Sequence, residues 1–221
     1  MDLERRAGRI VSILLITQMA GSALVNFRLE APLFGEPGFL VNAAAHAQQV
    51  GLSALIGLAL GALFSGIAIT VFPIVRAQSL SMALWLLVLG AAILAIAVVE
   101  QASVMSMVTF SEAYAKAPAT THDQFEALRV VVAAARNWPH FLARAMDGVA
   151  GLLFYATLFR FALVPRALAA SGLLAAAMQI TGVAMPLLGH DVVFPLLAPM
   201  GLTQLALALW LLVKGFRPRP A

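Results

Sequence analysis

The sequence predicts an all-α protein, an integral membrane bundle of six transmembrane helices. Of its 221 residues, 62% are hydrophobic and 11% are charged, with a mean hydropathy of +0.95. A soluble domain carries about 25% charged residues, and its exterior needs more polar cover than this chain has. The apolar residues are gathered in six runs, and basic residues lie at the ends of the runs. This pattern is typical of membrane topology.

Each apolar run is long enough to cross a bilayer, whose core of about 30 Å takes about 20 helical residues. We expect every run to be helical, because backbone amides in lipid must be hydrogen-bonded within their own segment. Prolines and glycines separate the runs, as at Pro32, Pro118 and Pro165. The predicted spans, which form one membrane domain over residues 1–221, are about 10–29, 50–75, 80–110, 138–164, 168–189 and 193–214.

The distribution of Lys and Arg predicts that both termini face the cytoplasm. Lys116, Arg28, Arg129, Arg136 and Arg144 would then lie on the outer side or just inside a span from it. The larger set would lie on the cytoplasmic side, as the positive-inside rule requires: Arg5, Arg6, Arg9, Arg76, Arg160, Arg166, Lys214, Arg217 and Arg219.

One of the two long outer connections has helical periodicity. Phe125, Leu128, Val131 and Val132 recur at helical spacing in the connection 111–137. This spacing predicts a short amphipathic helix at about 123–136 that lies in the outer membrane–water interface.

Several classes of chemistry are excluded or disfavoured. The chain has no cysteine, which excludes disulfides and thiolate sites. It contains no phosphate-binding glycine motif, zinc-protease motif or serine-nucleophile elbow, so we expect no catalytic residues and no cofactor, and a non-catalytic role is favoured over an enzymatic one. The net charge is +4, but the basic residues lie at the ends of the apolar runs and form no patch. We therefore expect the protein to contact the lipid bilayer and not nucleic acid.

The four histidines do not have the spacing of metal ligands. His46, His122, His140 and His190 all map to the outer side, and no two of them lie three or four residues apart. A metal or haem site needs several ligands that converge. We therefore expect no metal site.

Charged residues inside the spans are the strongest candidates for a site, because each costs roughly 2.5–3.5 kcal/mol near the membrane centre. Three residues qualify, namely Glu100, Arg144 and Asp147, and all three fall in the outer halves of their spans. His140, Arg144 and Asp147 share one face of span four. Glutamines of other spans fall near the same depth: Gln18, Gln179 and Gln204.

Two explanations of this polar layer remain open. In the functional one, the residues line a pocket open to the outer side, where Glu100 accepts a proton or cation and Arg144 is its partner. In the structural one, Arg144 and Asp147 neutralise each other as i, i+3 neighbours, and the glutamines bridge helices. A helix interruption beside such a pocket is most expected at Pro186 or at the pair Pro195 and Pro199.

Small residues recur every four positions along the second span. Gly57, Gly61 and Ser65 form a stripe that permits close helix approach. We expect this stripe to pack within the chain, with a dimer face as the alternative.

Several short motifs resemble a bacterial family of polytopic membrane proteins known as domain of unknown function 4386. The most specific are the closing run LALWLLVKGF at 207–216 and LVPR at 163–166. The resemblance implies a six-helix fold in the bacterial inner membrane but no activity. It also implies an acidic residue in span three, where Glu100 stands, and a glutamate before the closing run, where this chain has Gln204.

These observations favour three functions in order. The first is a non-catalytic accessory or structural component of a membrane complex, bound to a membrane-protein partner or to a second copy. The second is a small transporter, carrier or lipid- or small-molecule-binding bundle that uses the polar layer. The third is an intramembrane enzyme or redox protein.

Overall fold

Six long helices make up the body of the structure, a computed structural model that describes residues 3–218. Each is long and apolar enough to cross a membrane. The prediction of an all-α fold with six helices that could cross a membrane is therefore confirmed for these residues. The helices are α1 (Leu3–Leu24, continued by the π-helical segment Val25–Leu29), α4 (Ala47–Arg76), α5 (Leu80–Lys116), α6 (His122–Arg160), α7 (Arg166–Ala184) and α8 (Ala198–Lys214).

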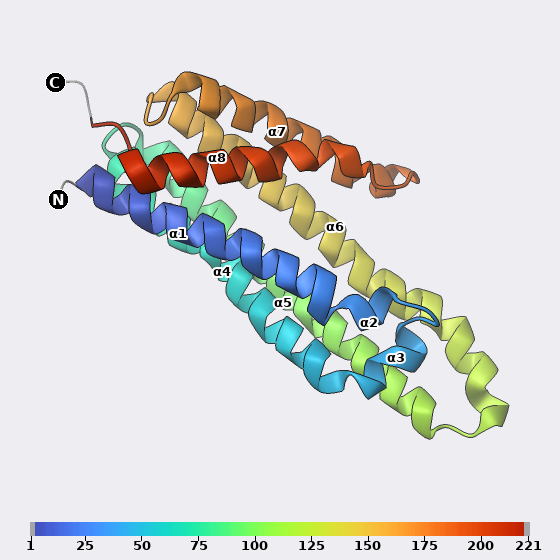
Figure 1. The fold of residues 1–221 in the computed structure, drawn as a ribbon. Coiled ribbons are helices and arrows are strands. Elements are labelled where there is room, and N and C mark those ends of the chain that lie inside the picture. The colour runs from blue at the N-terminus through green and yellow to red at the C-terminus, as the bar shows by residue number, and fades with distance from the viewer. Residues whose placement is uncertain (1–2, 219–221) are drawn as a thin grey trace.

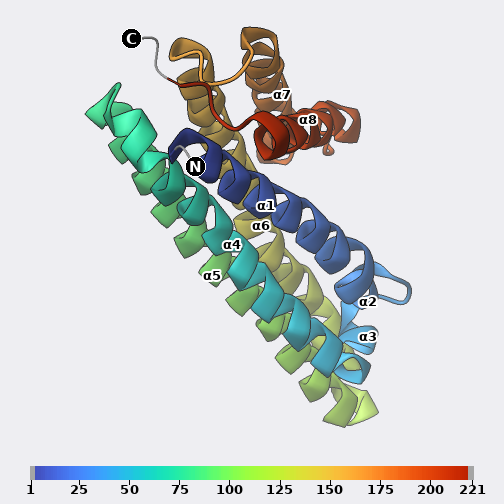
Figure 2. The same cartoon turned by 60° about the vertical axis from the view of Figure 1, so that its left-hand side comes forward.

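The six helices form a ring in chain order. Each long helix packs against the next, from α1 against α4 through to α7 against α8, and α8 packs against α1 (Figure 1). In Figure 2, α1 lies in front of α6, with α4 and α5 on one side and α7 and α8 on the other. The ring has an interior toward which each helix turns one face, and α1 and α6 face each other across it.

The ring is filled with apolar side chains at the end where α1 begins and α8 ends. Val11, Leu158 and Leu211 are fully buried in one large hydrophobic cluster there. The chain after α8 crosses this end. The backbone N–H of Phe216 donates to the oxygen of Glu4 (3.3 Å), and that of Arg217 donates to the oxygen of Leu163 (2.8 Å).

The first and last described residues of the chain thus lie at the same end of the bundle. That this end faces the cytoplasm stays a prediction. Of the basic residues counted for this side, Arg219 lies outside the described residues.

At the opposite end α5 and α6 extend beyond their neighbours as a hairpin (Figure 1). They have 37 and 39 residues, or about 55–60 Å each, well over the bilayer core of about 30 Å. Ring contacts between Phe110 and Phe125 (5.2 Å between centroids) and between Tyr114 and His122 (4.3 Å) hold the hairpin together. Two short helices, α2 (Ala31–Phe34) and α3 (Phe39–Ala45), lie beside it.

The segment 123–136 is helical but is not a separate helix, because α6 runs unbroken through Pro139. Its location at the membrane interface stays a prediction.

The prolines near the C-terminal end of α7 and the N-terminal end of α8 bound these helices and do not interrupt a long helix. Pro186 and Pro195 stand in short 3-10 turns, and Pro199 stands in the first turn of α8. The irregular backbone beside the ring interior is instead the π-helical segment Val25–Leu29. Local π-helix within an α-helix occurs frequently at functional sites.

Candidate functional site

The interior of the ring contains a cavity made of two joined hollows. The first, of about 50 Å³, lies among α1, α4, α5 and α6. The second, of about 160 Å³, reaches α7 and α8. Residues that line both hollows join them: Gln18, Ser22, Phe64, Arg144 and Asp147.

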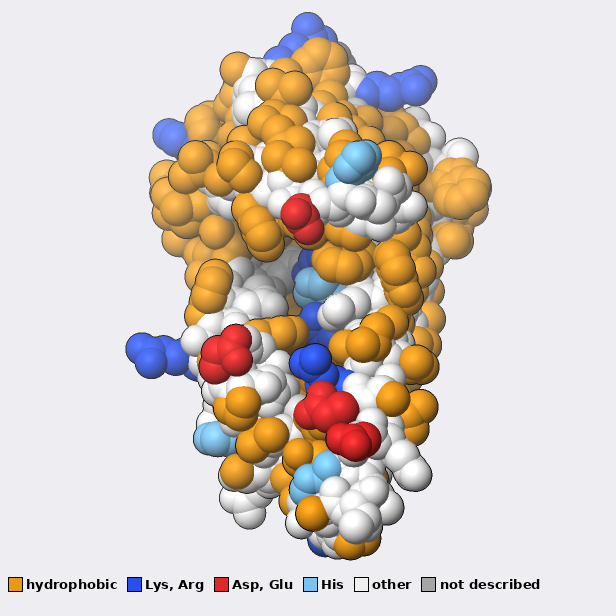
Figure 3. All heavy atoms as spheres, turned by 90° about the vertical axis from the view of Figure 1, so that its right-hand side faces the viewer, with side chains coloured by type: hydrophobic (Ala, Val, Ile, Leu, Met, Phe, Trp, Pro, Cys, Tyr) orange, Lys and Arg blue, Asp and Glu red, His pale blue; other side chains and the backbone are white. Residues whose placement is uncertain are grey.

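The cavity opens away from the end where α1 begins. Figure 3 faces the side that lies on the right in Figure 1, and it shows a hollow with basic and histidine side chains at its floor. Partial exposure of the polar side chains agrees with this opening, since the side chains of Arg144 and His140 are 37% and 23% exposed. Both hollows contain polar and apolar lining.

One face of α6 supplies the charged side of the cavity. Arg136, His140 and Arg144 follow one another at four-residue intervals, so they lie one turn apart on the same face. Each is paired with a carboxylate, from Glu30, Glu100 and Asp147 respectively. We call these three pairs the charge ladder.

The first pair of the ladder is Glu30 with Arg136. Nη2 of Arg136 donates to Oε2 of Glu30 at 2.8 Å, and both residues are buried, with exposed fractions of 4% and 2%. The guanidinium also lies over the ring of Phe34, 4.8 Å from its centroid. Sequence reasoning missed this pair because both residues were assigned to outer connections. The four-residue step from Arg136 to His140 is the signal that could have found it.

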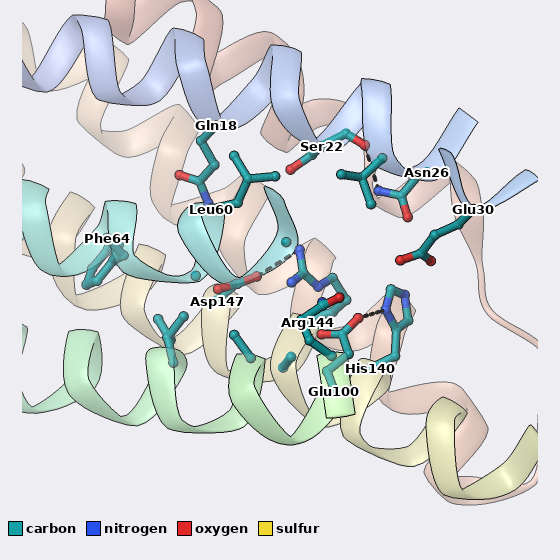
Figure 4. A pocket seen from close by; sticks show the side chains of 17 residues that line it. Gln18, Ser22, Asn26, Glu30, Leu60, Phe64, Glu100, His140, Arg144 and Asp147 are labelled. Carbon is teal, nitrogen blue, oxygen red and sulfur yellow. Dashed lines mark hydrogen bonds and ion pairs between the residues drawn. The ribbon is translucent and has the colours of Figure 1, made fainter. Parts of the chain in front are cut away.

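The second pair corrects the predicted partner of Glu100. Oε1 of Glu100 lies 2.7 Å from Nδ1 of His140, whereas the predicted partner, Arg144, is paired with Asp147 (Figure 4). The reason is the axial position of the two helices. Glu100 of α5 stands level with the turn of α6 that carries His140. Glu100 itself is buried, at 6% exposure.

The third pair, Arg144 with Asp147, matches the structural explanation of the polar layer. Nη1 of Arg144 lies 3.1 Å from Oδ2 of Asp147, and Nε2 of Gln179 donates to the backbone oxygen of Arg144 at 3.1 Å. Nε of Arg144, however, is buried without a hydrogen-bond partner. The local pair therefore leaves part of the guanidinium unsatisfied beside the cavity.

A second polar stripe faces the ladder from α1. Gln18, Ser22 and Asn26 follow at four-residue intervals and lead to Glu30. In Figure 4 they line the side of the cavity opposite Arg144 and His140. Ser22 and Asn26 were not predicted, although their four-residue spacing from Gln18 is visible in the sequence.

The structure brings all seven predicted polar residues to this cavity. Glu100 and His140 line the first hollow, Gln179 and Gln204 line the second, and the remaining three line both. Their role in binding stays a prediction.

The stripe of small residues lies inside the bundle, between α4 and α5. A Cβ at Gly61 would lie 2.5 Å from Cβ of Ala97, and one at Gly57 would lie 2.6 Å from Nε2 of Gln101. At Ser65 the glycine is on the other helix, since a Cβ at Gly90 of α5 would lie 3.0 Å from Cα of Ser65. The stripe thus allows the close approach of two neighbouring helices within the chain.

The other histidines lie away from the cavity. His46 ends α3, where its Nδ1 lies 2.9 Å from the oxygen of Asn42. His122 packs on Tyr114, and His190 lies in the connection from α7 to α8. Within residues 3–218 no three histidine, aspartate or glutamate side chains are placed to hold a metal ion.

Comparison with known proteins gives one match. No curated protein and no solved structure matches the chain. A family model described as "Domain of unknown function (DUF4386)" matches residues 10–215, which include α1 from Ile10 onward and the other five long helices in full. The chain therefore belongs to the DUF4386 family, as a polytopic membrane protein with the six-helix ring described above.

Proposed function

We propose that this protein is a small-solute-binding bundle of the carrier class, which holds a small polar ligand in the cavity inside the ring. The observation that carries the proposal is the convergence of polar side chains from α1, α5, α6, α7 and α8 on one cavity. Placing such groups in a membrane-spanning ring is costly, and intramembrane ionisable groups mark solute or ion pathways by default.

The size of the cavity restricts the ligand. Hollows of about 50 and 160 Å³ are well below the roughly 300–1,000 Å³ of pockets that take drug-sized molecules. A lipid chain or a large cofactor does not fit this space. A solute of a few heavy atoms does.

The chemistry of the lining favours a ligand that both donates and accepts hydrogen bonds. The guanidinium of Arg144 offers donors, the carboxylate of Asp147 offers acceptors, and the amide of Gln18 offers both. The buried Nε of Arg144 lacks a partner, and a buried unsatisfied donor is costly. A polar ligand or water that accepts from this donor would remove the cost.

The accessory-component hypothesis ranks second. Small residues exposed on a flat face would favour a docked partner. Gly57, Gly61 and Ser65 are instead used between α4 and α5. A membrane-protein partner or a second copy of the chain stays a prediction.

Filling the cavity tests the proposal. Ser22 lines both hollows, whereas Ala23, the next residue of α1, is exposed on the outer surface of the ring. Ser22→Trp is therefore expected to block the cavity, and Ala23→Trp serves as the matched control. The purified wild type and both variants are screened against small polar solutes, with thermal stability as the readout.

A solute that binds is expected to stabilise the wild type and Ala23→Trp by about 2.7 kcal/mol at a concentration of 100 times its Kd, and to leave Ser22→Trp unchanged. Native mass spectrometry of protein extracted from its own membrane checks for a retained ligand or partner protein. Equal responses of Ser22→Trp and the wild type to every solute would refute a ligand site in this cavity.

A further inference from the structure

The charge ladder contains one group whose charge can change near neutral pH. Arginine stays protonated in proteins, so Arg136 and Arg144 together balance two of the three carboxylates. Histidine is the side-chain type that gains or loses charge between about pH 5 and 8. The net charge of the ladder therefore depends on His140. It is zero with His140 protonated and −1 with His140 neutral.

Among residues 3–218, the lining of the first hollow contains no further group that compensates this charge. The segment after α1 contributes Glu30, α5 contributes Glu100, and α6 contributes Arg136, Arg144 and Asp147. The lining of the first hollow from α4 is Gly57, Leu60, Gly61 and Phe64, none of which titrates. Tyr155, in the second hollow, is neutral in the same pH range.

Loss of the proton from His140 would leave the carboxylate of Glu100 unbalanced in a buried site. An unbalanced charge is costly in a low-dielectric interior. The Glu100 carboxylate is buried but lines the first hollow. A cation in that hollow would restore neutrality, whereas a divalent ion would leave one positive charge in excess beside two arginines.

Neutral oxygen atoms are available around the same hollow. Oε1 of Gln101 is buried there with no hydrogen-bond partner. The amide of Asn26 donates to the backbone oxygen of Ser22 at 2.8 Å, and its own oxygen is directed into the hollow (Figure 4). Carboxylate and amide oxygens are the ligands that hard cations take in proteins.

We infer that the first hollow binds one small monovalent cation in exchange for the proton held between His140 and Glu100. The inference rests on the proposed function, because it places the cation in one of the two hollows of the same cavity. In the exchange, the cation takes a position beside the Glu100 carboxylate. The proton leaves Nδ1 or Nε2 of His140 for water at the open side of the cavity. One positive charge enters and one leaves, so the ladder stays neutral in both states.

The test measures cation binding and proton release together on the purified wild-type protein in detergent. The probes are sodium, potassium and methylammonium chloride, and N-methylglucamine chloride, whose cation is too large for the hollow, keeps the ionic strength constant. A pH indicator in weak buffer reports the protons released. We expect one proton per cation bound at acidic pH, and an apparent affinity that rises about tenfold per pH unit until His140 is neutral and is constant above that.

Three variants separate exchange from a structural role of the pair. His140→Gln leaves the ladder at −1 between about pH 5 and 8, so over that range cation binding is expected to persist, without proton release and without pH dependence. Glu100→Gln makes the ladder neutral with His140 uncharged, so cation binding is expected to be lost. Glu126→Gln, which removes an exposed carboxylate paired with Arg129, is the control and is expected to behave as the wild type.

The wild-type series can overturn the inference by itself, because cation binding that releases no proton, or whose affinity does not change with pH, refutes the exchange. Undiminished proton release from His140→Gln also refutes it. If neutral solutes stabilise the wild type but not Ser22→Trp and no cation binds, the exchange fails and the proposed function stands. If neither solutes nor cations bind, both fail.

Discussion

The buried pair of Glu30 and Arg136 gives a quantitative prediction about stability. Both side chains are almost fully buried, and their N···O distance is 2.8 Å. Removal of one partner from a buried ion pair leaves an uncompensated charge and costs about 3–5 kcal/mol. Glu30 lines the cavity and can meet water there. We therefore expect the lower part of that range, about 3 kcal/mol, for Arg136→Gln or Glu30→Gln.

The double variant Glu30→Gln/Arg136→Gln removes both charges, so it is expected to be more stable than either single variant. The free energy of unfolding is measured by reversible titration with a denaturing detergent, followed by circular dichroism. The control is Arg129→Gln in the same helix. Its pair with Glu126 has a similar distance, 3.0 Å, but is about half exposed, and such pairs contribute about 0.2–1 kcal/mol.

Two results would refute this reasoning. If Arg136→Gln costs no more than Arg129→Gln, the first pair of the ladder is not buried as described. If the double variant loses the sum of the two single losses, the two residues do not act as a pair.

Three further predictions use other parts of the structure. The chain has no cysteine, so a single introduced cysteine reports the access of water at its own position. Ser22→Cys is expected to react with a small water-soluble thiol reagent in the folded protein, whereas Val11→Cys, at a position with 0% exposure, is not. Fast modification of Val11→Cys would show that the apolar end of the ring is open to water. Gly61→Ala brings a Cβ within 2.5 Å of a Cβ of α5 and is expected to cost about 1–3 kcal/mol in the detergent titration. Gly51→Ala on the same helix meets open space and is expected to be neutral or to stabilise by up to about 1 kcal/mol. Equal losses of unfolding free energy in Gly61→Ala and Gly51→Ala would count against close packing of α4 on α5. His190→Cys is expected to be labelled by an impermeant maleimide outside intact cells, and labelling only after cell disruption would place the termini outside.

The sequence alone determined the fold class and the presence of six helices long and apolar enough to cross a membrane. This was possible because the membrane acts on each segment separately. A run of apolar residues such as 80–110 must be helical and must cross whatever its neighbours do, since its backbone has no other hydrogen-bond partners in lipid. The ends of the helices were less predictable, since α6 continues as a single helix through residues that were assigned to an outer connection.

The depth of the polar residues was also visible in the sequence, because depth follows from counting residues along a helix. Counting does not give the rotation of one helix about its axis or its axial shift against a neighbour. A shift of one turn, about 5.4 Å, exchanges one partner on α6 for the next. The sequence therefore predicted Arg144 for Glu100, where the structure has His140.

Only the tertiary structure decided that the polar residues share one cavity. Gln18 and Gln204 stand 186 positions apart in the chain, and they line the same hollow because α8 closes the ring against α1. The pairing of Glu30 with Arg136 has the same origin, since the segment after α1 reaches α6 across the interior. Hydropathy acts along one helix at a time and fixes which segments enter the membrane. Side-chain packing between helices fixes which faces they turn toward one another.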